Sequence, residues 1–196
     1  LSQVQTTNDT SFVKTRQRDA VAGGFQLALE GEEDDSSAHG VETIGYLAIE
    51  SGRGRLGVVE YEAFTTGSLY DETGVTLTFT EGFDQAPGLL SSLASFNGSD
   101  AAALRYDTLS ETGVRVYVNE GTTFDAEIRH APEAVSYLAF HGSGFVSGQS
   151  QVGDVFGETG VIANVTDQPQ AILLERTYVN PVVIAQSASF NGVDEV

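Results

Sequence analysis

The chain repeats itself, and this repetition constrains its fold more than any other sequence feature. Three short runs each occur twice: Tyr-Leu-Ala-Ile/Phe at 46–49 and 137–140, Ser-Phe-Asn-Gly at 95–98 and 189–192, and Glu-Thr-Gly-Val at 72–75 and 158–161. Their spacing is roughly 90 residues, which is the size of one small sandwich domain. The sequence therefore predicts a tandem array of similar domains.

The repeat pattern also sets the expected domain boundaries. Residues 1–52 are predicted to be the C-terminal part of a first repeat, 53–144 a complete repeat, and 145–196 the N-terminal part of a third. Partial repeats could leave sheet edges unpaired, which invites strand addition. Two alternatives remain open: strands near 155–192 complete the sheets that residues 1–50 begin, or the folding unit is permuted relative to these boundaries.

Within the repeats, apolar and polar side chains alternate over short runs at 25–29, 75–79 and 114–118. Such alternation is typical of half-buried strands, and Gly, Asn, Asp and Ser between the runs indicate turns. No segment carries a long apolar stripe at helical spacing. We therefore predict an all-β fold, built from antiparallel β-sandwich repeats in tandem. The side chains expected in the core are Val75, Leu77, Phe79, Val114, Val116, Val118, Leu138 and Phe140.

The charge of the chain restricts its partners and its location. Aspartate and glutamate total 28 against 9 lysines and arginines, which gives a formal net charge of −19. Such a surface repels nucleic acid and anionic lipid. No apolar run approaches the roughly 20 residues of a membrane-spanning helix. We therefore expect no nucleic-acid partner, no membrane insertion, and a secreted or cell-surface location, which the absence of cysteine also fits.

The order of the predicted elements resembles the H-type lectin domain. It comprises a proline-bearing strand entry at 180–184, a Phe-Asn-Gly turn, an arginine-bearing strand, a Thr-Gly or Gly-Gly turn and a closing Tyr-Leu-Ala-Ile-Glu strand. The resemblance covers nearly the whole chain and implies a six-stranded antiparallel β-sandwich. It also implies binding of galactose-type sugars, trimerisation, and a place among tandem repeats of a larger bacterial-type extracellular protein.

The resemblance also implies particular ligand-binding residues. The family's sugar site uses an arginine from the fourth strand, and Arg16 and Arg105 each lie eight residues before the turn glycine of their repeat. The family's aromatic and histidine positions fall instead near Asp34 and Asp125, so Phe124 is the nearest aromatic candidate. The alternatives are a salt bridge for each arginine and core or interface packing for the aromatic side chain.

A histidine and a glutamate recur at the same spacing before the last strand of each repeat, as His39 with Glu42 and His130 with Glu133. These pairs could orient a ligand hydroxyl, or lock the entry to the last strand by hydrogen bonds. Metal coordination is a third possibility, although no third ligand has metal-site spacing.

The densest cluster of carboxylates lies at residues 30–35. Calcium prefers such hard oxygen ligands, so its candidate ligands are Glu32, Glu33, Asp34 and Asp35. The alternative is a solvated acidic loop. We predict no other cofactor and no other metal.

No enzyme motif is present: the chain lacks a nucleophile elbow, a zinc-protease motif, a phosphate-binding glycine loop and cysteine. We therefore expect a protein that is not an enzyme. The first functional hypothesis is an extracellular adhesion module that binds glycans or glycoconjugates multivalently. The alternative is a structural tandem unit, a spacer or a self-assembling module without a ligand, whose partners are neighbouring repeats or copies in a trimer or a linear assembly.

Overall fold

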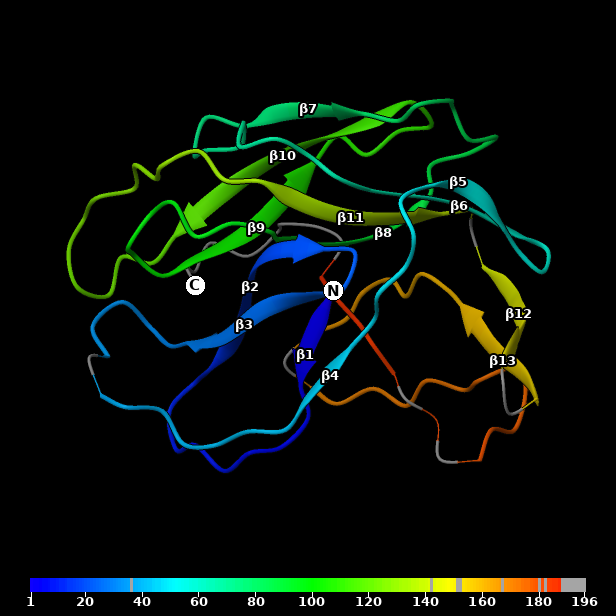
Figure 1. The fold of residues 1–196 in the computed structure, drawn as a ribbon, viewed down its shortest axis with the longest axis horizontal. Helices are drawn as coiled ribbons and strands as arrows, with labels where there is room; N and C mark the ends of the chain where they lie inside the picture. Colours follow the sequence, from blue (N-terminus) through cyan, green and yellow to red (C-terminus); the bar gives the residue numbers. More distant parts are fainter. Residues whose placement is uncertain are drawn as a thin grey trace.

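The computed structural model describes residues 1–35, 37–141, 143–150, 153–166, 168–179, 181 and 183–187. These residues form strands β1 to β13 joined by turns and loops, and they contain no helix (Figure 1). All pairings between the strands are antiparallel. The predicted all-β, antiparallel fold is confirmed.

Residues 52–140 form a sandwich of two sheets. One sheet has the order β5-β6-β11-β8 and the other has the order β7-β10-β9 (Figure 1). The first sheet consists of β5 (Gly52–Leu56), β6 (Val59–Thr65), β11 (Val135–Phe140) and β8 (Gly88–Leu93). The second consists of β7 (Val75–Thr78), β10 (Gly113–Glu120) and β9 (Ala102–Asp107). β5 adds a seventh strand to the six that the sequence implies, because it forms a hairpin with β6.

The main core lies between these two sheets. Alternating residues of β10, namely Val114, Val116 and Val118, pack there against Val135 and Tyr137 of β11. Of the predicted core residues, all are buried except Val75, which is partly buried and packs against the main core. Leu138 and Phe140 differ in location: they point to the opposite face of β11, where they form a second cluster with Val59 and Ala63.

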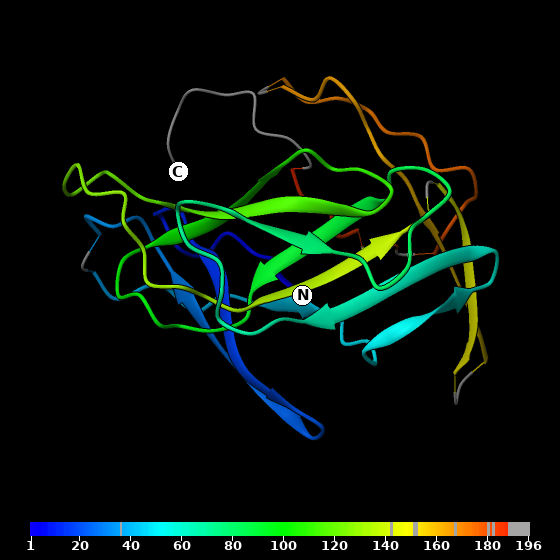
Figure 2. The same cartoon turned by 90° about the horizontal axis from the view of Figure 1, so that it is seen from above.

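The N-terminal segment repeats part of this architecture. β1 (Ser2–Val4) pairs with β4 (Ile44–Tyr46), and β2 (Lys14–Val21) forms a hairpin with β3 (Gly24–Glu30) that projects beyond the sandwich (Figure 2). In the complete repeat, β8 pairs with β11 and β9 with β10 in the same way.

The registers of the two sets of strands agree residue by residue. Ser2 lies opposite Tyr46 in the first set, as Ser91 lies opposite Tyr137 in the second. Arg16 lies opposite Ala28, as Arg105 lies opposite Tyr117. Residues 1–46 and 88–140 therefore share one strand plan. Among the described residues, no strands pair with β3 and β4 as β7 and β6 pair with β10 and β11.

Two ring side chains of the first set are more exposed than the residues at the equivalent positions of the complete repeat. Tyr46 is 64% exposed, whereas the equivalent Tyr137 is 6% exposed. Phe25 is 37% exposed, whereas the equivalent Val114 is 1% exposed. In the complete repeat, strands β6 and β7 pair beside the strands that carry these residues.

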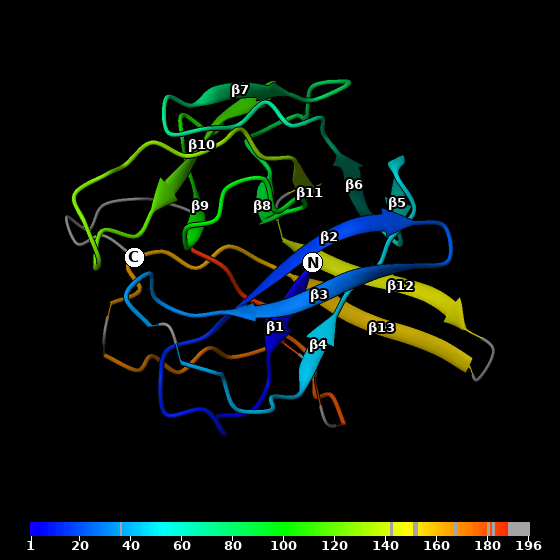
Figure 3. The ribbon, with the colours of Figure 1, turned by 60° about the vertical axis from the view of Figure 1, so that its left-hand side comes forward.

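After β11 the chain forms a hairpin of β12 (Gly144–Ser150) and β13 (Gly153–Thr159). Among the described residues, β4 pairs only with β1 and β13 only with β12 (Figure 3). Residues 189–192 of the sequence repeat, and residues 180 and 182 of the proline-bearing strand entry, lie outside the described residues.

Candidate functional site

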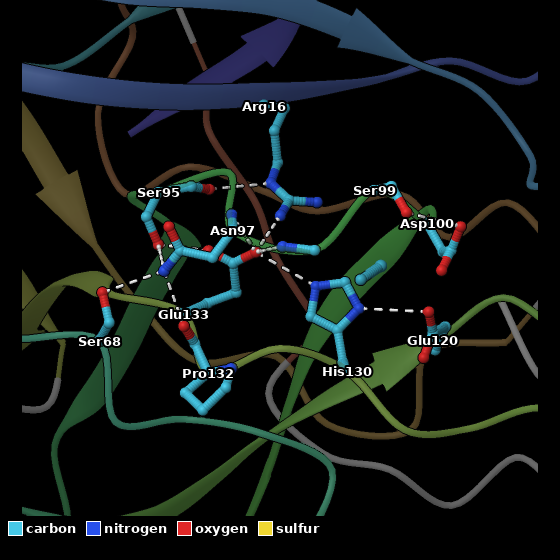
Figure 4. A network of polar contacts seen from close by, with 12 residues as sticks. Arg16, Ser68, Ser95, Asn97, Ser99, Asp100, Glu120, His130, Pro132 and Glu133 are labelled. Carbon is cyan, nitrogen blue, oxygen red and sulfur yellow. Dashed lines mark hydrogen bonds and ion pairs between the residues drawn. The ribbon is translucent and has the colours of Figure 1, made fainter.

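The most extensive buried polar network joins the N-terminal segment to the complete repeat. Arg16 projects from β2, and its Nη2 donates to Oε1 of Glu133 at 2.7 Å (Figure 4). Its Nε donates to the carbonyl oxygen of Ser95 at 3.1 Å, and its Nη1 donates to Glu30 at 2.8 Å. The guanidinium also lies 4.6 Å from the ring centroid of Phe96. Arg16 is only 3% exposed, so the complete repeat and its own strand pair surround it.

Glu133 is the centre of this network and is fully buried. Besides the arginine, the amides of Asn97 and Gly98 donate to its Oε1 at 2.9 and 3.0 Å, and the hydroxyl of Ser95 donates to its Oε2. Burial alone would raise the pKa of the Glu133 carboxyl, but hydrogen bonds from His130, Gly98, Ser95 and Asn97 lower it to about 2. Glu133 is therefore an anion whose oxygen atoms are occupied by protein donors.

His130 lies between two carboxylates. Its Nε2 is 3.2 Å from Oε1 of Glu133, and its Nδ1 is 3.3 Å from Oε1 of Glu120. Burial would lower the pKa of His130, but hydrogen bonds to Glu133 and Glu120 outweigh burial and raise it. Burial raises the pKa of Glu120. The imidazole thus contacts protein groups on both sides, and it is 5% exposed.

We call the hydrogen bonds that hold Glu133 at the entry to the last strand the glutamate lock. A second glutamate lock occurs in the N-terminal segment, at Glu42. The hydroxyl of Thr6 donates to Oε2 of Glu42, as the Ser95 hydroxyl does to the glutamate of the complete repeat. The same two hydroxyls accept from the backbone amides of Thr43 and Ala134 at 2.8 and 2.7 Å. Both hydroxyls thereby fix the residue that follows the glutamate, at the entry to the last strand.

An asparagine completes each lock. Nδ2 of Asn8 donates to the carbonyl oxygen of Val41 at 2.8 Å, and Nδ2 of Asn97 donates to that of Pro132 at 2.7 Å. Sequence reasoning missed Thr6 and Asn8. The signal that could have found them is a hydroxyl residue followed two positions later by asparagine, at residues 6–8 and 95–97.

The two histidines differ in their partners. Nδ1 of His39 lies 3.5 Å from Oδ2 of Asp9, and the imidazole is partly buried. Asp9 stands where the complete repeat has Gly98, and its amide likewise donates to the glutamate of its lock, Glu42. His39 therefore pairs with an aspartate, whereas His130 pairs with two glutamates.

Further contacts join the two segments around Arg16. Oε2 of Glu30 accepts from the amide of Ala102 at 3.4 Å, and Nε2 of Gln17 donates to the hydroxyl of Ser92 at 2.9 Å. We call Arg16 and Gln17 with their partners in the complete repeat the joint. It spans β2 of the N-terminal segment, β8, and the loops that follow β8 and precede β11.

The acidic loop also contacts the complete repeat. The amide of Asp34 donates to the hydroxyl of Thr123 at 3.3 Å, and the amide of Phe124 donates to Glu33 at 3.2 Å. Across the described residues, no three metal-ligating side chains are grouped so that they could hold an ion, and this covers the calcium candidates at 32–35. The Phe124 ring is 74% exposed.

Arg105 lines a groove of about 290 Å³ that adjoins the joint at Ser92. The groove is lined by the N-terminal segment, including Gln3 and Lys14, by β8 and β9, and by residues 184–187. Its lining contains no aromatic side chain within the described part of the chain. The structure thus brings together Arg16, His130 and Glu133, while Arg105, Phe124, and the pair His39 and Glu42 lie at other places.

Comparison with known proteins gives one informative similarity. No family model matches the chain, and no solved structure matches it. Over 150 residues, which is 75% of this chain, the sequence is 35% identical to halomucin of Haloquadratum walsbyi. The matched region spans only 2% of the halomucin length. In the part of the chain that the structure describes, no helix is long and apolar enough to cross a membrane.

Proposed function

We propose that this chain is a structural unit of a tandem array of β-sandwiches, in a secreted or cell-surface protein, and that the joint fixes each repeat to the next. The observation that carries this proposal is the hydrogen bond from Arg16 of one repeat to the buried Glu133 of the following repeat. The proposed role is mechanical and involves no catalysis.

The saturation of the Glu133 carboxylate supports a structural role for the joint. A ligand-binding carboxylate must keep an oxygen available to its ligand, whereas Glu133 already accepts from Arg16, Ser95, Asn97 and Gly98. Burying an unpaired charge costs several kcal/mol, so each partner in such a network holds the other in place. The joint therefore favours one orientation of the two repeats.

The position of Arg105 supports a similar contact between the complete repeat and the predicted third repeat. Arg105 occupies in the complete repeat the strand position that Arg16 occupies in the first set of strands. The groove around it is lined by residues 184–187, which precede the second Ser-Phe-Asn-Gly run as residues 90–93 precede the first. Arg105 thus lines the same groove as residues 184–187, which belong to the predicted third repeat.

The similarity to halomucin supports a place within a long chain. A segment that is 35% identical to this one accounts for only 2% of that protein, so sequences of this type are embedded in much longer polypeptides. The similarity is compatible with an extracellular adhesion or structural module. The net charge of −19 favours a soluble module that repels other copies of itself except at fitted surfaces.

The experiment that tests the proposed role compares Arg16→Gln with the control Arg18→Gln. Both arginines lie on β2, but Arg18 has a side chain that is 52% exposed and pairs with Asp19 at 3.5 Å. In urea unfolding, we expect Arg16→Gln to lower the free energy of unfolding by about 3–5 kcal/mol, because it leaves Glu133 buried without its cation. Equal, small effects of both substitutions would contradict a structural joint.

Recognition of a neutral, galactose-type sugar is a second candidate function, in line with the H-type lectin resemblance. The observation that favours it is the groove, which places Arg105 among the polar side chains of Gln3, Thr15 and Gln186. An arginine can donate several hydrogen bonds in a fixed geometry to sugar hydroxyls.

A glycan array tests this second function. We expect the chain to bind galactose-type glycans, and Arg105→Ala to abolish binding while the circular dichroism spectrum is unchanged. The control Arg115→Ala, whose side chain is 44% exposed and pairs with Asp107, should bind as the unmodified chain does. Absence of binding by the unmodified chain would rule out this function and leave the structural role intact.

A further inference from the structure

The glutamate lock of the complete repeat holds an asparagine and a glycine that are neighbours in the sequence. The backbone amides of Asn97 and Gly98 donate to Oε1 of Glu133 at 2.9 and 3.0 Å (Figure 4). Nδ2 of Asn97 donates to the carbonyl oxygen of Pro132 at 2.7 Å and to the hydroxyl of Ser68 at 3.1 Å. The lock therefore fixes the main chain of both residues and the side chain of the asparagine.

The structure requires glycine at position 98 because His130 fills the space beside it. A Cβ atom on Gly98 would overlap the imidazole ring of His130. The ring lies between Glu120 and Glu133, and its side chain is 1% exposed, so it cannot move aside. An asparagine followed directly by glycine is therefore a necessity of this lock.

The lock of the N-terminal segment does not contain this pair. There Asn8 is followed by Asp9, whose amide donates to Glu42 at 2.5 Å. The imidazole of His39 lies beside Gly31 instead, where an added Cβ would overlap it. Within the residues that the structure describes, asparagine followed by glycine occurs only at 97–98.

Asparagine followed by glycine is the pair most prone to deamidation, because glycine has no Cβ to hinder its amide nitrogen. In this reaction the nitrogen of Gly98 attacks Cγ of Asn97 and forms a five-membered succinimide ring. The Cγ–Nδ2 bond breaks, and Nδ2 leaves as ammonia with the proton that the Gly98 amide gives up. Water then cleaves one of the two carbonyl–nitrogen bonds of the ring, which leaves aspartate or isoaspartate at position 97.

Two features of the lock oppose this reaction. The Gly98 amide must lose its proton to attack, but it donates that proton to Glu133, whose pKa of about 2 keeps it an anion. A negative charge at hydrogen-bond distance makes removal of the amide proton more costly in a buried site. The side chain of Asn97 would also have to leave Pro132 and Ser68 to bring Cγ to the nitrogen.

We propose that Asn97 is a deamidation site that the closed glutamate lock protects, and that opening of the lock allows the reaction and makes the opening permanent. The aspartate product has a carboxylate in place of the amide, so it has no hydrogen to donate to Pro132. The isoaspartate product lengthens the main chain by a methylene group, so the two amides no longer reach Glu133 together. Either product leaves a buried acceptor without its donor, which is costly.

The inference rests on contacts within the complete repeat and not on the joint, so its failure would leave the proposed array role untouched. The first test incubates the chain in mildly alkaline buffer and follows Asn97 by peptide mass spectrometry. We expect Asn97 to react at least about tenfold more slowly in the folded chain than in the chain unfolded in urea, because the folded lock opens rarely. The control in the same digest is Asn119, which is followed by Glu120 and should react slowly in both states.

The second test compares two glutamate variants. Glu133→Gln removes the charge beside the Gly98 amide, whereas Glu62→Gln changes an equally buried glutamate that accepts from the amide of Thr80. Both variants are measured where their circular dichroism spectra match that of the folded chain. We expect deamidation of Asn97 to be about tenfold faster in Glu133→Gln than in Glu62→Gln, because the lock loses hydrogen bonds to a charged group.

A milder variant serves if Glu133→Gln does not fold. Ser68→Ala removes one acceptor of Nδ2 of Asn97 at an exposed site, and it should raise the rate at Asn97. The control Ser136→Ala removes a hydroxyl that contacts Thr65 away from the lock, and it should leave the rate unchanged.

The product itself can be tested with Asn97→Asp, which reproduces one of the two outcomes of the reaction. Because this variant cannot donate to Pro132, we expect it to lower the melting temperature and to increase hydrogen exchange at the entry to β11.

Three results would overturn this inference. Equal rates at Asn97 in the folded chain and in urea would show that the lock gives no protection. A folded Glu133→Gln, or Ser68→Ala in its place, that reacts no faster than its control would show that the hydrogen bonds of the lock do not control the reaction. An Asn97→Asp variant with the stability of the unmodified chain would show that the product does not keep the lock open.

Discussion

Nη2 of Arg16 lies 2.7 Å from Oε1 of Glu133, although the two residues are 117 positions apart in the sequence. The arginine belongs to the first set of strands, and the glutamate locks the entry to the last strand of the complete repeat. The same carboxylate therefore has two tasks: it fixes a loop within its own repeat through Ser95 and Asn97, and it fixes the preceding repeat through Arg16.

A double-mutant cycle should detect this coupling. The variants are Arg16→Gln, Glu133→Gln and the combination of both, and the measured quantity is the free energy of unfolding in urea. Because the two groups are buried and share a charge-assisted hydrogen bond, we expect an interaction energy of about 1–3 kcal/mol. The sum of the two single effects should exceed the effect of the double variant. Additive effects would show that the contact has no energetic role.

The pH dependence of stability should report on His130. The pKa of His130 is raised in the folded chain, so its contribution is complete below the ordinary value of 6.5 and is lost as the pH rises. Burial raises the pKa of Glu120, which acts in the same direction. Glu133, with a pKa of about 2, contributes above its ordinary value of 4.5 and loses this contribution only toward pH 2. We therefore expect the free energy of unfolding to fall between pH 5 and pH 8.

The variant His130→Gln isolates this effect. It should flatten the decline in unfolding free energy above pH 6.5, measured by urea titration in molar NaCl. The control His141→Gln changes a histidine outside the network, whose Nε2 lies 3.4 Å from Nε2 of Gln85, and it should keep the slope of the unmodified chain. Identical slopes for His130→Gln and the unmodified chain would show that the imidazole does not titrate between the two carboxylates.

The strand plan of this protein could be predicted from the sequence because it depends on local patterns. Alternation at residues 114–118 placed β10, and the recurring Tyr-Leu-Ala run placed β11. The shared spacing of His130 and Glu133 with His39 and Glu42 indicated a repeated polar element. These features lie within one strand or one loop, where short-range periodicity decides which side chains share a face.

The joint could not be predicted, because it depends on how two repeats sit against each other. Arg16 was identified as a strand arginine, but a contact across 117 residues has no local signal. For the lock at Glu42, the sequence indicated the glutamate but not its partners. Thr6 and Asn8 form the same hydrogen bonds as Ser95 and Asn97, but the residues around them differ. The division of the buried apolar residues into two clusters could not be predicted either, because it depends on β11 being covered on both faces.

A core substitution tests the second apolar cluster. Phe140 is 6% exposed and packs with Val59, Ala63 and Leu138, so Phe140→Ala should cost about 3–5 kcal/mol of unfolding free energy. The exposed Phe124 provides the control, because Phe124→Ala should change stability by no more than about 0.5 kcal/mol. Comparable losses for both variants would contradict the burial assigned to Phe140.

Salt should stabilise the chain. With a net charge of −19, the folded surface repels itself, and ions at molar concentration screen this repulsion. We expect the melting temperature to rise between low and molar NaCl. An unchanged melting temperature would contradict this account. A rise that requires calcium and does not occur with sodium would instead indicate a metal site at residues 32–35.

Hydrogen exchange measured by mass spectrometry tests the structural role of the joint most directly, because it follows the two segments separately. Protection of the amides in residues 14–30 should depend on Arg16, which ties β2 to the complete repeat. We predict that Arg16→Gln increases exchange throughout β2 and β3 while β10 and β11 keep their protection, and that Arg18→Gln leaves both segments unchanged. If β2 and β3 exchange at the same rate in Arg16→Gln and in the unmodified chain, the arginine does not hold the two repeats together.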